Sequence, residues 1–334
     1  MKKNLWNKIL IGILTISLTT VIACSNKQSN DNKSTKSGKQ NIVIKYGYQP
    51  GHTQIIVAQD KGWLKDEFEK DGITFQLQKF SSGPPMIEAM TGQKLDFGQV
   101  GDQPAIQARA NNVDIKAIAA YGTSEKADAL VATKKSGINK ISDIKGKKVG
   151  VPIGSVAQQL LYIYLKSVGL KPSDIQQVNL QPADIRSSLL SNNIDAAVIW
   201  EPVVTQTVST GTVKQVADGT GYKKEVDVII AQNSFLKQHP DIVVRLLKVL
   251  NKTAKWIDAN PEETIKIISK DTGVKQDVLK PGFDKTSHNL NITDEGIQSV
   301  KATARFLREN KVIRKDVNID DLIDLNYAKK AGIQ

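Results

Sequence analysis

Five short segments combine glycine or proline with small polar residues at points where a strand should give way to a helix. They span residues 49–53, 81–85, 101–104, 154–155 and 200–202. Glycine allows a ligand to approach the backbone closely, and the free N–H groups of a helix's first turn attract anions. None of the five segments contains Lys or Arg. This favours a small, permanently ionised group such as a sulfonate, held by neutral donors, over a phosphate that needs an arginine fork.

The candidate ligand contacts are the polar, glycine, proline and aromatic residues of these segments. Serine or aspartate at such a position is also a common helix N-cap, and Asp102 with Glu201 could instead form an acid pair for hydrolysis. Trp200 could belong to the core or line the mouth of a cleft. We expect contacts from Gln49, Gly51, His52, Thr53, Ser81, Ser82, Gly83, Pro84, Asp102, Gly154, Ser155, Trp200 and Glu201.

The sequence lacks the common signatures of an enzyme. Cys24 is the only cysteine, the three histidines are far apart, and no HExxH, GxxxxGK[ST] or GxSxG motif occurs. A zinc cluster, a redox pair, a phosphate-binding loop and a nucleophile elbow therefore have no residues to build them. We predict a protein without catalysis, metal or cofactor.

Strands and helices must position these loops, and the pattern after residue 40 predicts both. Short β-branched runs such as 42–48, 73–80 and 95–100 alternate with amphipathic segments such as 53–70 and 84–91. This βαβ rhythm predicts a largely parallel sheet, whose carboxyl-end loops border a ligand crevice. A second series of the same kind runs from 147 to 208, and helical periodicity predicts helices over 239–260, from Pro261 onward and over 293–310.

The two series share spacings. The Lys-x-Gly at 45–47 is matched at 148–150, and Asp96 and Asp102 are matched by Asp195 and Glu201 at the same separation. This echo indicates two similar α/β lobes. The runs 129–134 and 226–231 are interpreted as two crossings that form a hinge. The first lobe is then discontinuous, comprising 41–128 and 232–334, and the second lobe is 129–231.

The N-terminus is typical of an exported protein. Residues 1–23 have a basic start and a 15-residue apolar run, too short for a transmembrane helix, followed by Cys24. They resemble a lipoprotein signal peptide, with Cys24 as the lipidated residue. Residues 24–40 lack a core-forming pattern and are predicted to be a flexible tether. Residues 1–40 carry +6 of the net charge of +12, so the rest of the chain lacks the charge typical of a nucleic-acid binder.

Several motifs together resemble one family, the aliphatic-sulfonate-binding proteins within the nitrate/sulfonate/taurine group of ABC-importer solute receptors. The matching motifs are FxxGPPxxEA at 80–89, LDFGxxGDxP at 95–104, IKGKKV at 144–149, Gly154-Ser155, PADxR at 182–186, IDA at 194–196 and WEP at 200–202. The resemblance implies a type II periplasmic-binding-protein fold without catalysis. It also implies delivery of the ligand to a membrane permease driven by a cytoplasmic ATPase. It adds Asp184 to the expected ligand contacts.

The sequence departs from the sulfonate branch at three of these motifs. Val156 follows Ser155 where the branch has a second serine and then a histidine, and Glu201 follows Trp200 where it has aspartate. Residues 100–103 read Val-Gly-Asp-Gln where the branch has a Thr-Gly-Asp run. An aliphatic sulfonate is our main prediction, and taurine, nitrate or a thiamine-type pyrimidine stays open. We expect a monomer tethered by lipid to the outer face of the cytoplasmic membrane. Two other classes stay open: an enzyme on the same fold, and a surface adhesion or scaffold lipoprotein.

Overall fold

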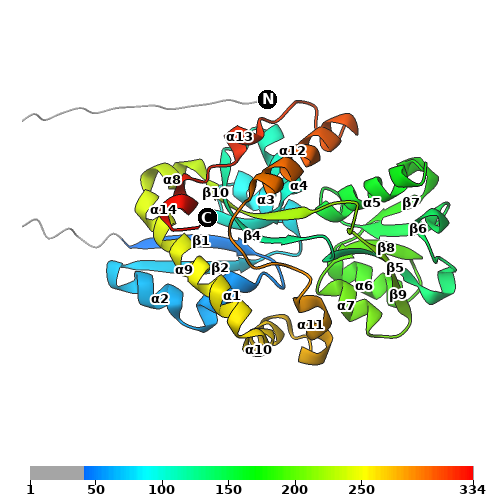
Figure 1. Cartoon of the computed structure of the whole chain (residues 1–334), viewed down its shortest axis with the longest axis horizontal. Helices are drawn as coiled ribbons and strands as arrows, with labels where there is room; N and C mark the ends of the chain where they lie inside the picture. Colours follow the sequence, from blue (N-terminus) through cyan, green and yellow to red (C-terminus); the bar gives the residue numbers. More distant parts are fainter. Residues whose placement is uncertain (1–40, 334) are drawn as a thin grey trace, which may run out of the picture. The chain divides into compact units, whose positions relative to one another are not determined.

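The structure is a computed structural model that describes residues 41–333. Strands rich in β-branched residues alternate with helices in the first part, as the βαβ pattern predicts (Figure 1). These elements are β1 (Ile42–Tyr48), α1 (Thr53–Asp60), α2 (Trp63–Phe68), β2 (Ile73–Lys79), α3 (Gly83–Thr91), β3 (Phe97–Gly101), α4 (Asp102–Ala110) and β4 (Ile115–Ser124). The next elements repeat this rhythm. They are β5 (Asp128–Thr133), β6 (Lys148–Val151), α5 (Val156–Ser167), β7 (Gln176–Asn179), α6 (Pro182–Leu190), β8 (Ala196–Trp200), α7 (Val203–Val208), β9 (Val213–Asp218) and β10 (Glu225–Gln232).

The strands form two five-stranded sheets of the same design. The first has the order β2-β1-β3-β10-β4, and the second has the order β7-β6-β8-β5-β9. In each sheet the fourth strand, β10 or β5, runs antiparallel to its neighbours, whereas the first three strands are parallel. The predicted α/β class with two similar lobes is confirmed.

The sequence echo corresponds to an equivalent contact in each sheet. The backbone N–H of Lys45 donates to the carboxylate of Asp96 at 2.8 Å, and the N–H of Lys148 donates to Asp195 at the same distance. Asp96 stands just before β3 and ties it to the neighbouring β1, and Asp195 stands just before β8 and ties it to the neighbouring β6. The aspartates and lysines therefore recur because the same strand junction is built twice.

Two short segments connect the sheets, and they are not the runs expected from the sequence. The segments 125–127 and 219–224 link β4 to β5 and β9 to β10. The expected crossings, 129–134 and 226–231, are instead mostly strands within the sheets. Because β10 pairs with β3 and β4, its residues belong to the first sheet, so the expected boundary of the second lobe at 231 is wrong. Hydrogen bonding on both sides makes β10 a central strand of that sheet.

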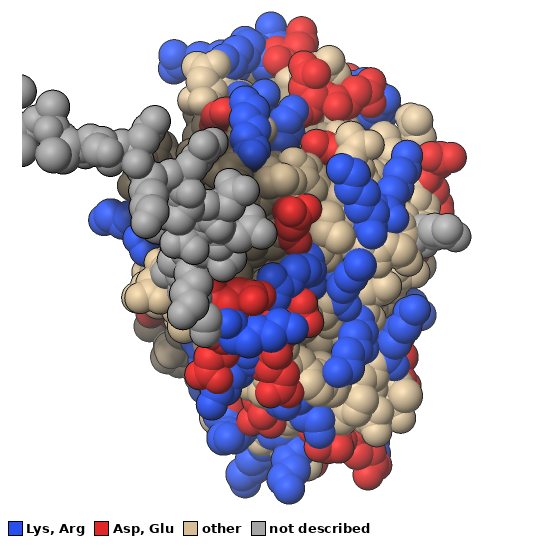
Figure 2. Space-filling view, turned by 90° about the vertical axis from the view of Figure 1, so that its left-hand side faces the viewer, with Lys and Arg blue, Asp and Glu red and all other residues tan. Residues whose placement is uncertain are grey.

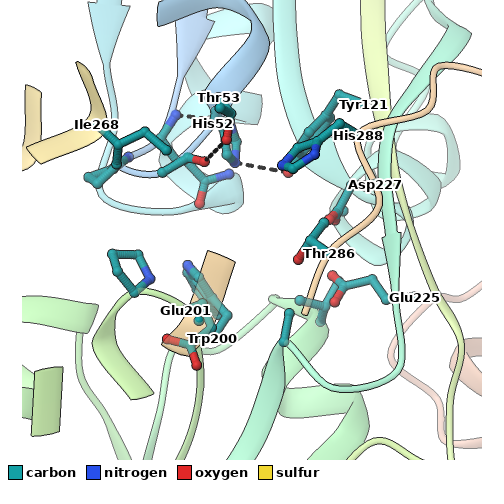
Figure 3. Close-up of a pocket in the computed structure, with 18 of the residues that line it drawn as sticks. His52, Thr53, Tyr121, Trp200, Glu201, Glu225, Asp227, Ile268, Thr286 and His288 are labelled. Carbon is teal, nitrogen blue, oxygen red and sulfur yellow. Dashed lines mark hydrogen bonds between the residues drawn. The ribbon is translucent and has the colours of Figure 1, made fainter. Parts of the chain in front are cut away.

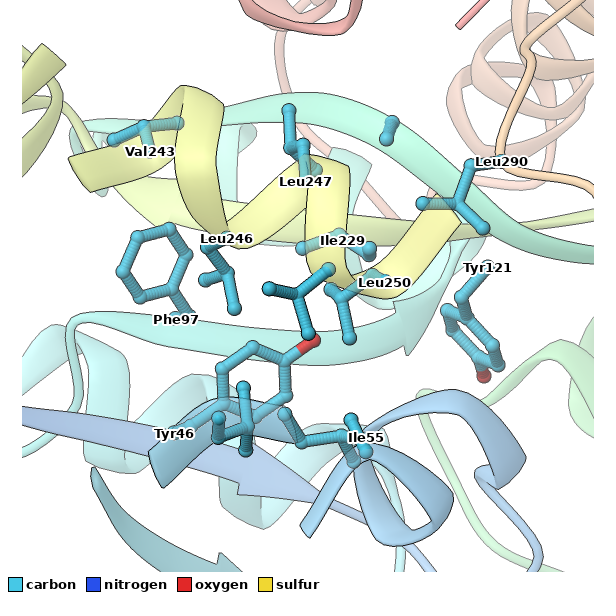
Figure 4. Close-up of a cluster of buried hydrophobic side chains, with 14 of the residues drawn as sticks. Tyr46, Ile55, Phe97, Tyr121, Ile229, Val243, Leu246, Leu247, Leu250 and Leu290 are labelled. Carbon is cyan, nitrogen blue, oxygen red and sulfur yellow. The ribbon is translucent and has the colours of Figure 1, made fainter. Parts of the chain in front are cut away.

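Seven helices follow β10 within residues 41–333, and three of them begin where the periodicity predicts, at Pro240, Pro261 and Asp294. The seven helices are α8 (Asn233–Gln238), α9 (Pro240–Ala259), α10 (Pro261–Thr272), α11 (Gln276–Phe283), α12 (Asp294–Glu309), α13 (Ile319–Leu322) and α14 (Asn326–Lys330). The apolar stripe of α9 covers one face of the first sheet, where Figure 4 shows Leu246 and Leu250 directed toward Tyr46 and Ile229. Helix α12 contributes Val300 and other apolar residues to a second cluster with α4 and β10. The second sheet has its own clusters on its two faces.

The described surface carries charges of both signs. On the face shown in Figure 2, Lys and Arg side chains are interspersed with Asp and Glu. Arg245 of α9, for example, is paired with Glu67 and Asp71 at 2.7 Å each. Within residues 41–333, no helix is both long and apolar enough to cross a membrane. The expected signal peptide, Cys24 and the tether lie outside the described residues.

Candidate ligand-binding site

A cavity of about 130 Å³ lies among the carboxyl-end loops of both sheets. Figure 3 shows His52 and Thr53 on one side of it, with Trp200 and Glu201 opposite. Its volume is close to the roughly 150 Å³ of a protein cavity that holds benzene. The cavity therefore suits a ligand of a few non-hydrogen atoms.

Helix starts from both sheets reach this cavity. Thr53 begins α1 and Gly83 begins α3 on the side of the first sheet, and Ser155 precedes α5 on the side of the second. Gly51 lines the cavity with a φ of +90°, a conformation that side chains disfavour. Each helix start contributes about 0.3–1 kcal/mol to the binding of an anion. The expected convergence of helix starts is present, and ligand binding by them stays a prediction.

Four of the expected contact residues lie outside the cavity lining, at the place where α3 meets the loops of the second sheet. They are Ser81, Ser82, Pro84 and Gly154. The hydroxyls of Ser81 and Ser82 both donate to Oε1 of Gln181 at 2.9 Å. A Cβ added at Gly154 would lie 3.4 Å from Pro84. These residues join α3 to the loops of the second sheet, so the structure gives them a contact between lobes.

The two aspartates predicted as contacts also lie outside the cavity lining. Asp102 is buried, and its carboxylate accepts hydrogen bonds from Lys223 at 2.8 Å and from Thr303 at 2.6 Å. It also accepts from the backbone N–H of Gln103 at 2.8 Å. Asp184 is exposed in the first turn of α6. The Asp102 carboxylate is thus bound by Lys223, Thr303 and the backbone of its own helix, at a place outside the cavity lining.

His52 lines the cavity as a buried, neutral side chain. The backbone N–H of Gln49 donates to its Nδ1 at 3.0 Å, so the proton of the neutral ring is on Nε2. Nε2 lies 2.8 Å from the hydroxyl of Tyr121, and burial lowers the pKa of His52 to about 3. The ring therefore donates to the Tyr121 oxygen, which leaves the Tyr121 proton free to point into the cavity.

A family model described as NMT1/THI5-like matches residues 49–264, more than half of the chain. The chain belongs to the NMT1/THI5-like family. A Bacillus subtilis protein named for binding aliphatic sulfonates is 32% identical to it over 324 residues, which cover 96% of each chain. The predicted resemblance is thereby confirmed.

Solved structures share the fold of this NMT1/THI5-like chain. The periplasmic aliphatic sulphonate-binding protein SsuA from Escherichia coli is 26% identical, with a TM-score of 0.74 over 84% of this chain and 92% of that one. The alkanesulfonate-binding protein SsuA from Xanthomonas axonopodis, bound to MOPS, is 21% identical, with a TM-score of 0.78 over 86% and 99%. The type II periplasmic-binding-protein fold is confirmed.

The cavity of this NMT1/THI5-like protein is also lined by residues that the sequence patterns did not predict. They are Tyr121 at the end of β4, Glu225 and Asp227 of β10, and a group from the segment around α10 and α11 that includes Ile268, Phe283, Thr286 and His288. Glu225 and Asp227 are two residues apart in a strand and so face the same way, which is a signal that the sequence contained. The C-terminal group had no local signal, because long-range packing brings it to the cavity.

The charged groups that line the cavity are acidic. Glu201 is paired with Lys285 at 2.6 Å and also accepts from the N–H and hydroxyl of Thr205. Burial and the neighbouring Glu225 raise the pKa of Asp227 well above its usual value. The sequence predicted neutral donors alone, so it missed the acidic side chains that line the cavity, Glu225 and Asp227 among them.

Proposed function

We propose that this protein is an extracytoplasmic receptor of an ABC importer that binds a small organic anion, an aliphatic sulfonate, without transforming it. The observation that carries this proposal is the cavity itself, because the starts of α1, α3 and α5 reach it from both sheets. A ligand that contacts both sheets favours the form in which they close around it.

The names of the relatives support the sulfonate as the ligand class. A sulfonate stays ionised at physiological pH and offers acceptor oxygens only, which suits backbone N–H groups and the Tyr121 hydroxyl. Gly51, Gly83 and Ser155 would supply backbone contacts, and Trp200 would cover the ligand's carbon chain. The Ser155 hydroxyl donates to the carbonyl of Pro152 at 2.7 Å, so its proton is already used.

The proposal includes a membrane anchor and two protein partners. Residues 1–23 would be removed as a signal peptide, Cys24 would carry the lipid, and residues 24–40 would tether a monomeric receptor to the outer face of the cytoplasmic membrane. The closed receptor would deliver its ligand to a permease driven by a cytoplasmic ATPase. Mass spectrometry of the membrane-extracted protein tests the anchor, since an unmodified Cys24 would contradict it.

Calorimetric titration of the purified protein tests the ligand. We expect binding of short alkanesulfonates in the micromolar range and a change in fluorescence from Trp200, which the Trp200→Phe variant would lose. If nitrate, sulfate or a thiamine-type pyrimidine binds more tightly than the alkanesulfonates, the ligand belongs to that class instead. Turnover of the added compound would favour an enzyme, and absence of any small-molecule binding would favour a surface scaffold.

A further inference from the structure

The positive charge of residues 41–334 is concentrated at one place. Residues 134–148, 166–176, 193–195 and 212–214, which we call the distal edge, contain nine lysines and three aspartates, a net charge of +6. Residues 41–334 as a whole also carry +6, so the rest of these residues is balanced. The lysines of the distal edge are Lys134, Lys135, Lys140, Lys145, Lys147, Lys148, Lys166, Lys171 and Lys214.

Backbone pairing brings the four segments of the distal edge together where the parallel strands of the second sheet begin. Lys148 begins β6 beside the start of β7, and its N–H donates to Asp195, just before β8. At the end of the antiparallel β5, the N–H of Lys134 donates to the carbonyl of Thr212 at 2.9 Å. Helix α5 starts at the cavity and runs back along the sheet, which brings Lys166 to the same edge. The lysines therefore surround the edge of the second sheet that faces away from the cavity.

The lysines of the distal edge are not neutralised by carboxylates of the described residues. None of their ammonium groups lies within 4.0 Å of a carboxylate of residues 41–333. Lys147 and Lys214 donate to neutral oxygens, the carbonyl of Ser136 at 2.8 Å and the amide of Asn139 at 2.5 Å. The other seven lysines are exposed. Each of the three aspartates instead accepts a hydrogen bond from the backbone N–H of a lysine of the edge.

The composition of the distal edge indicates a diffuse negative surface as its partner. All nine of its basic residues are lysine, and none is arginine. Arginine binds a single phosphate or carboxylate through a planar fork, whereas lysine is a hydrated point charge on a flexible stem. Lysines spread over several loops therefore suit mobile lipid headgroups better than one fixed acidic pocket. Clusters of about four to eight basic residues next to a bilayer bind anionic lipids.

We propose that the distal edge rests on the headgroups of a bilayer that contains anionic lipids. This inference rests on the lipid anchor of the proposed function. The attraction between lysines and an anionic surface fades over a Debye length of about 8–10 Å, so the edge must be held near the bilayer. An anchor at Cys24 would supply that proximity.

Contact at the distal edge would orient the receptor without covering its cavity. The carboxyl-end loops of both sheets line the cavity, so the start of β1, where residues 24–40 attach, and the distal edge both point away from it. The anchor and the distal edge would hold the protein at two places and restrict its rotation over the bilayer. The cavity between them would stay open to the ligand and to the permease.

A fluorescent label on the distal edge tests this contact in the full chain. With Cys24→Ser, the change Ser173→Cys supplies the only cysteine, at an exposed position of the edge. The vesicles consist of phosphatidylcholine, alone or with one part in three of phosphatidylglycerol, and some headgroups carry a nitroxide that quenches a label in contact with the bilayer. The apolar run at 9–23 could attach the chain to either kind of vesicle, so the label, and not sedimentation, is the readout. We expect strong quenching on the anionic vesicles only.

Charge-removing variants that carry the same label locate the effect. The first variant replaces three exposed lysines of the distal edge, as Lys135→Gln, Lys145→Gln and Lys171→Gln. Each lysine near an anionic surface contributes roughly fivefold to binding, so quenching should fall to the level of the neutral vesicles. The matched control replaces three exposed lysines on the side of α9 to α11, as Lys255→Gln, Lys266→Gln and Lys275→Gln. It should be quenched like the wild type.

Several results would overturn the proposal. They are equal quenching on neutral and anionic vesicles, no loss in the first variant, and equal loss in the first variant and the control. About 0.5 M salt should abolish the quenching, because it shortens the Debye length to a few Å, and quenching that persists would contradict an electrostatic contact. Polyglutamate stands in for an acidic protein, and tighter binding to it than to the anionic vesicles would show that the partner is a protein and the proposal is wrong.

Failure of this proposal is distinguishable from failure of the proposed function. Calorimetric titration with an alkanesulfonate measures the cavity, which lies away from the distal edge. The first variant should bind the alkanesulfonate as the wild type does, which also shows that it is folded. A protein that binds alkanesulfonate but gives no quenching is a receptor without this membrane contact. A protein that is quenched on anionic vesicles but binds no small molecule has the membrane contact and loses the receptor function.

Discussion

The carboxylate of Glu201, at the end of β8, lies 2.6 Å from the ammonium of Lys285, beyond α11. Glu201 follows a strand of the second sheet, whereas Lys285 belongs to a segment that packs on β4 of the first, where Ser287 bridges to Thr123. The side chains are 11% and 22% exposed. The ion pair therefore joins the two halves at the wall of the cavity and should favour the closed form.

Replacing Lys285 with methionine should weaken this closure. Glu201 would keep its bonds to Thr205 and lose the Lys285 ammonium, and an unpaired, largely buried charge is unfavourable. We expect ligand affinity to fall about tenfold and small-angle scattering to show a more open free protein. Lys280→Met is the control, since the Lys280–Glu262 pair of 3.4 Å is exposed. Unchanged affinity in Lys285→Met would show that the pair does not support closure.

Tyr121→Phe should remove a donor to the ligand. The Tyr121 oxygen accepts a hydrogen bond from the His52 ring, so the phenol proton is available to a ligand in the cavity. A hydrogen bond to a charged group contributes about 1.5–3 kcal/mol, which predicts at least a tenfold loss of affinity by calorimetry. Tyr327→Phe, whose hydroxyl donates to the Leu236 carbonyl outside the cavity, should bind normally. A similar loss in both variants would contradict this role for Tyr121.

The buried His52 should make the protein less stable in mild acid. Its pKa is about 3 in the folded protein and about 6.5 when unfolded. Between these values the unfolded state binds more protons, so the free energy of unfolding decreases as the pH falls through 6.5. The expected contribution is about 2 kcal/mol between pH 7 and pH 5. Urea unfolding of the wild type and His52→Asn at both pH values measures it.

Buried acids with raised pKa values, such as Asp128 and Asp227, make the free energy of unfolding increase as the pH falls. They are present in both the wild type and His52→Asn, so the difference between the two proteins isolates the effect of His52. If His52→Asn loses as much stability as the wild type between pH 7 and pH 5, His52 is not held neutral.

Gly101→Ala should hold the two halves apart. The added Cβ would overlap Val156 at the start of α5 and would lie 3.2 Å from Glu225. Overpacking of this kind costs about 1–3 kcal/mol, so we expect affinity to fall roughly tenfold. The double variant with Val156→Ala removes the overlapping methyl groups and should recover most of the loss. If the double variant does not recover affinity, Gly101 is needed for a reason other than the close approach of α5 to β3.

The sequence by itself determined the local features of this protein. Helix α9 begins after His239 and α10 begins at Pro261, because proline and the apolar periodicity act over a few residues. The aspartates at 96 and 195 recur because each makes the same bond to a nearby strand. The sequence predicted that the five polar loops follow strands, and Gly51, Gly83, Ser155 and Trp200 of these loops do line the cavity.

Only the tertiary structure decided which of these residues share the cavity and what faces them. Strand β10 runs opposite to β3 and so brings Glu225 and Asp227 to the edge where β3 ends. The segment after α11 returns over β4 and brings His288, more than 160 residues from Tyr121, to the same space. Such contacts depend on the direction of strands and on packing between distant parts of the chain, which local periodicity does not contain.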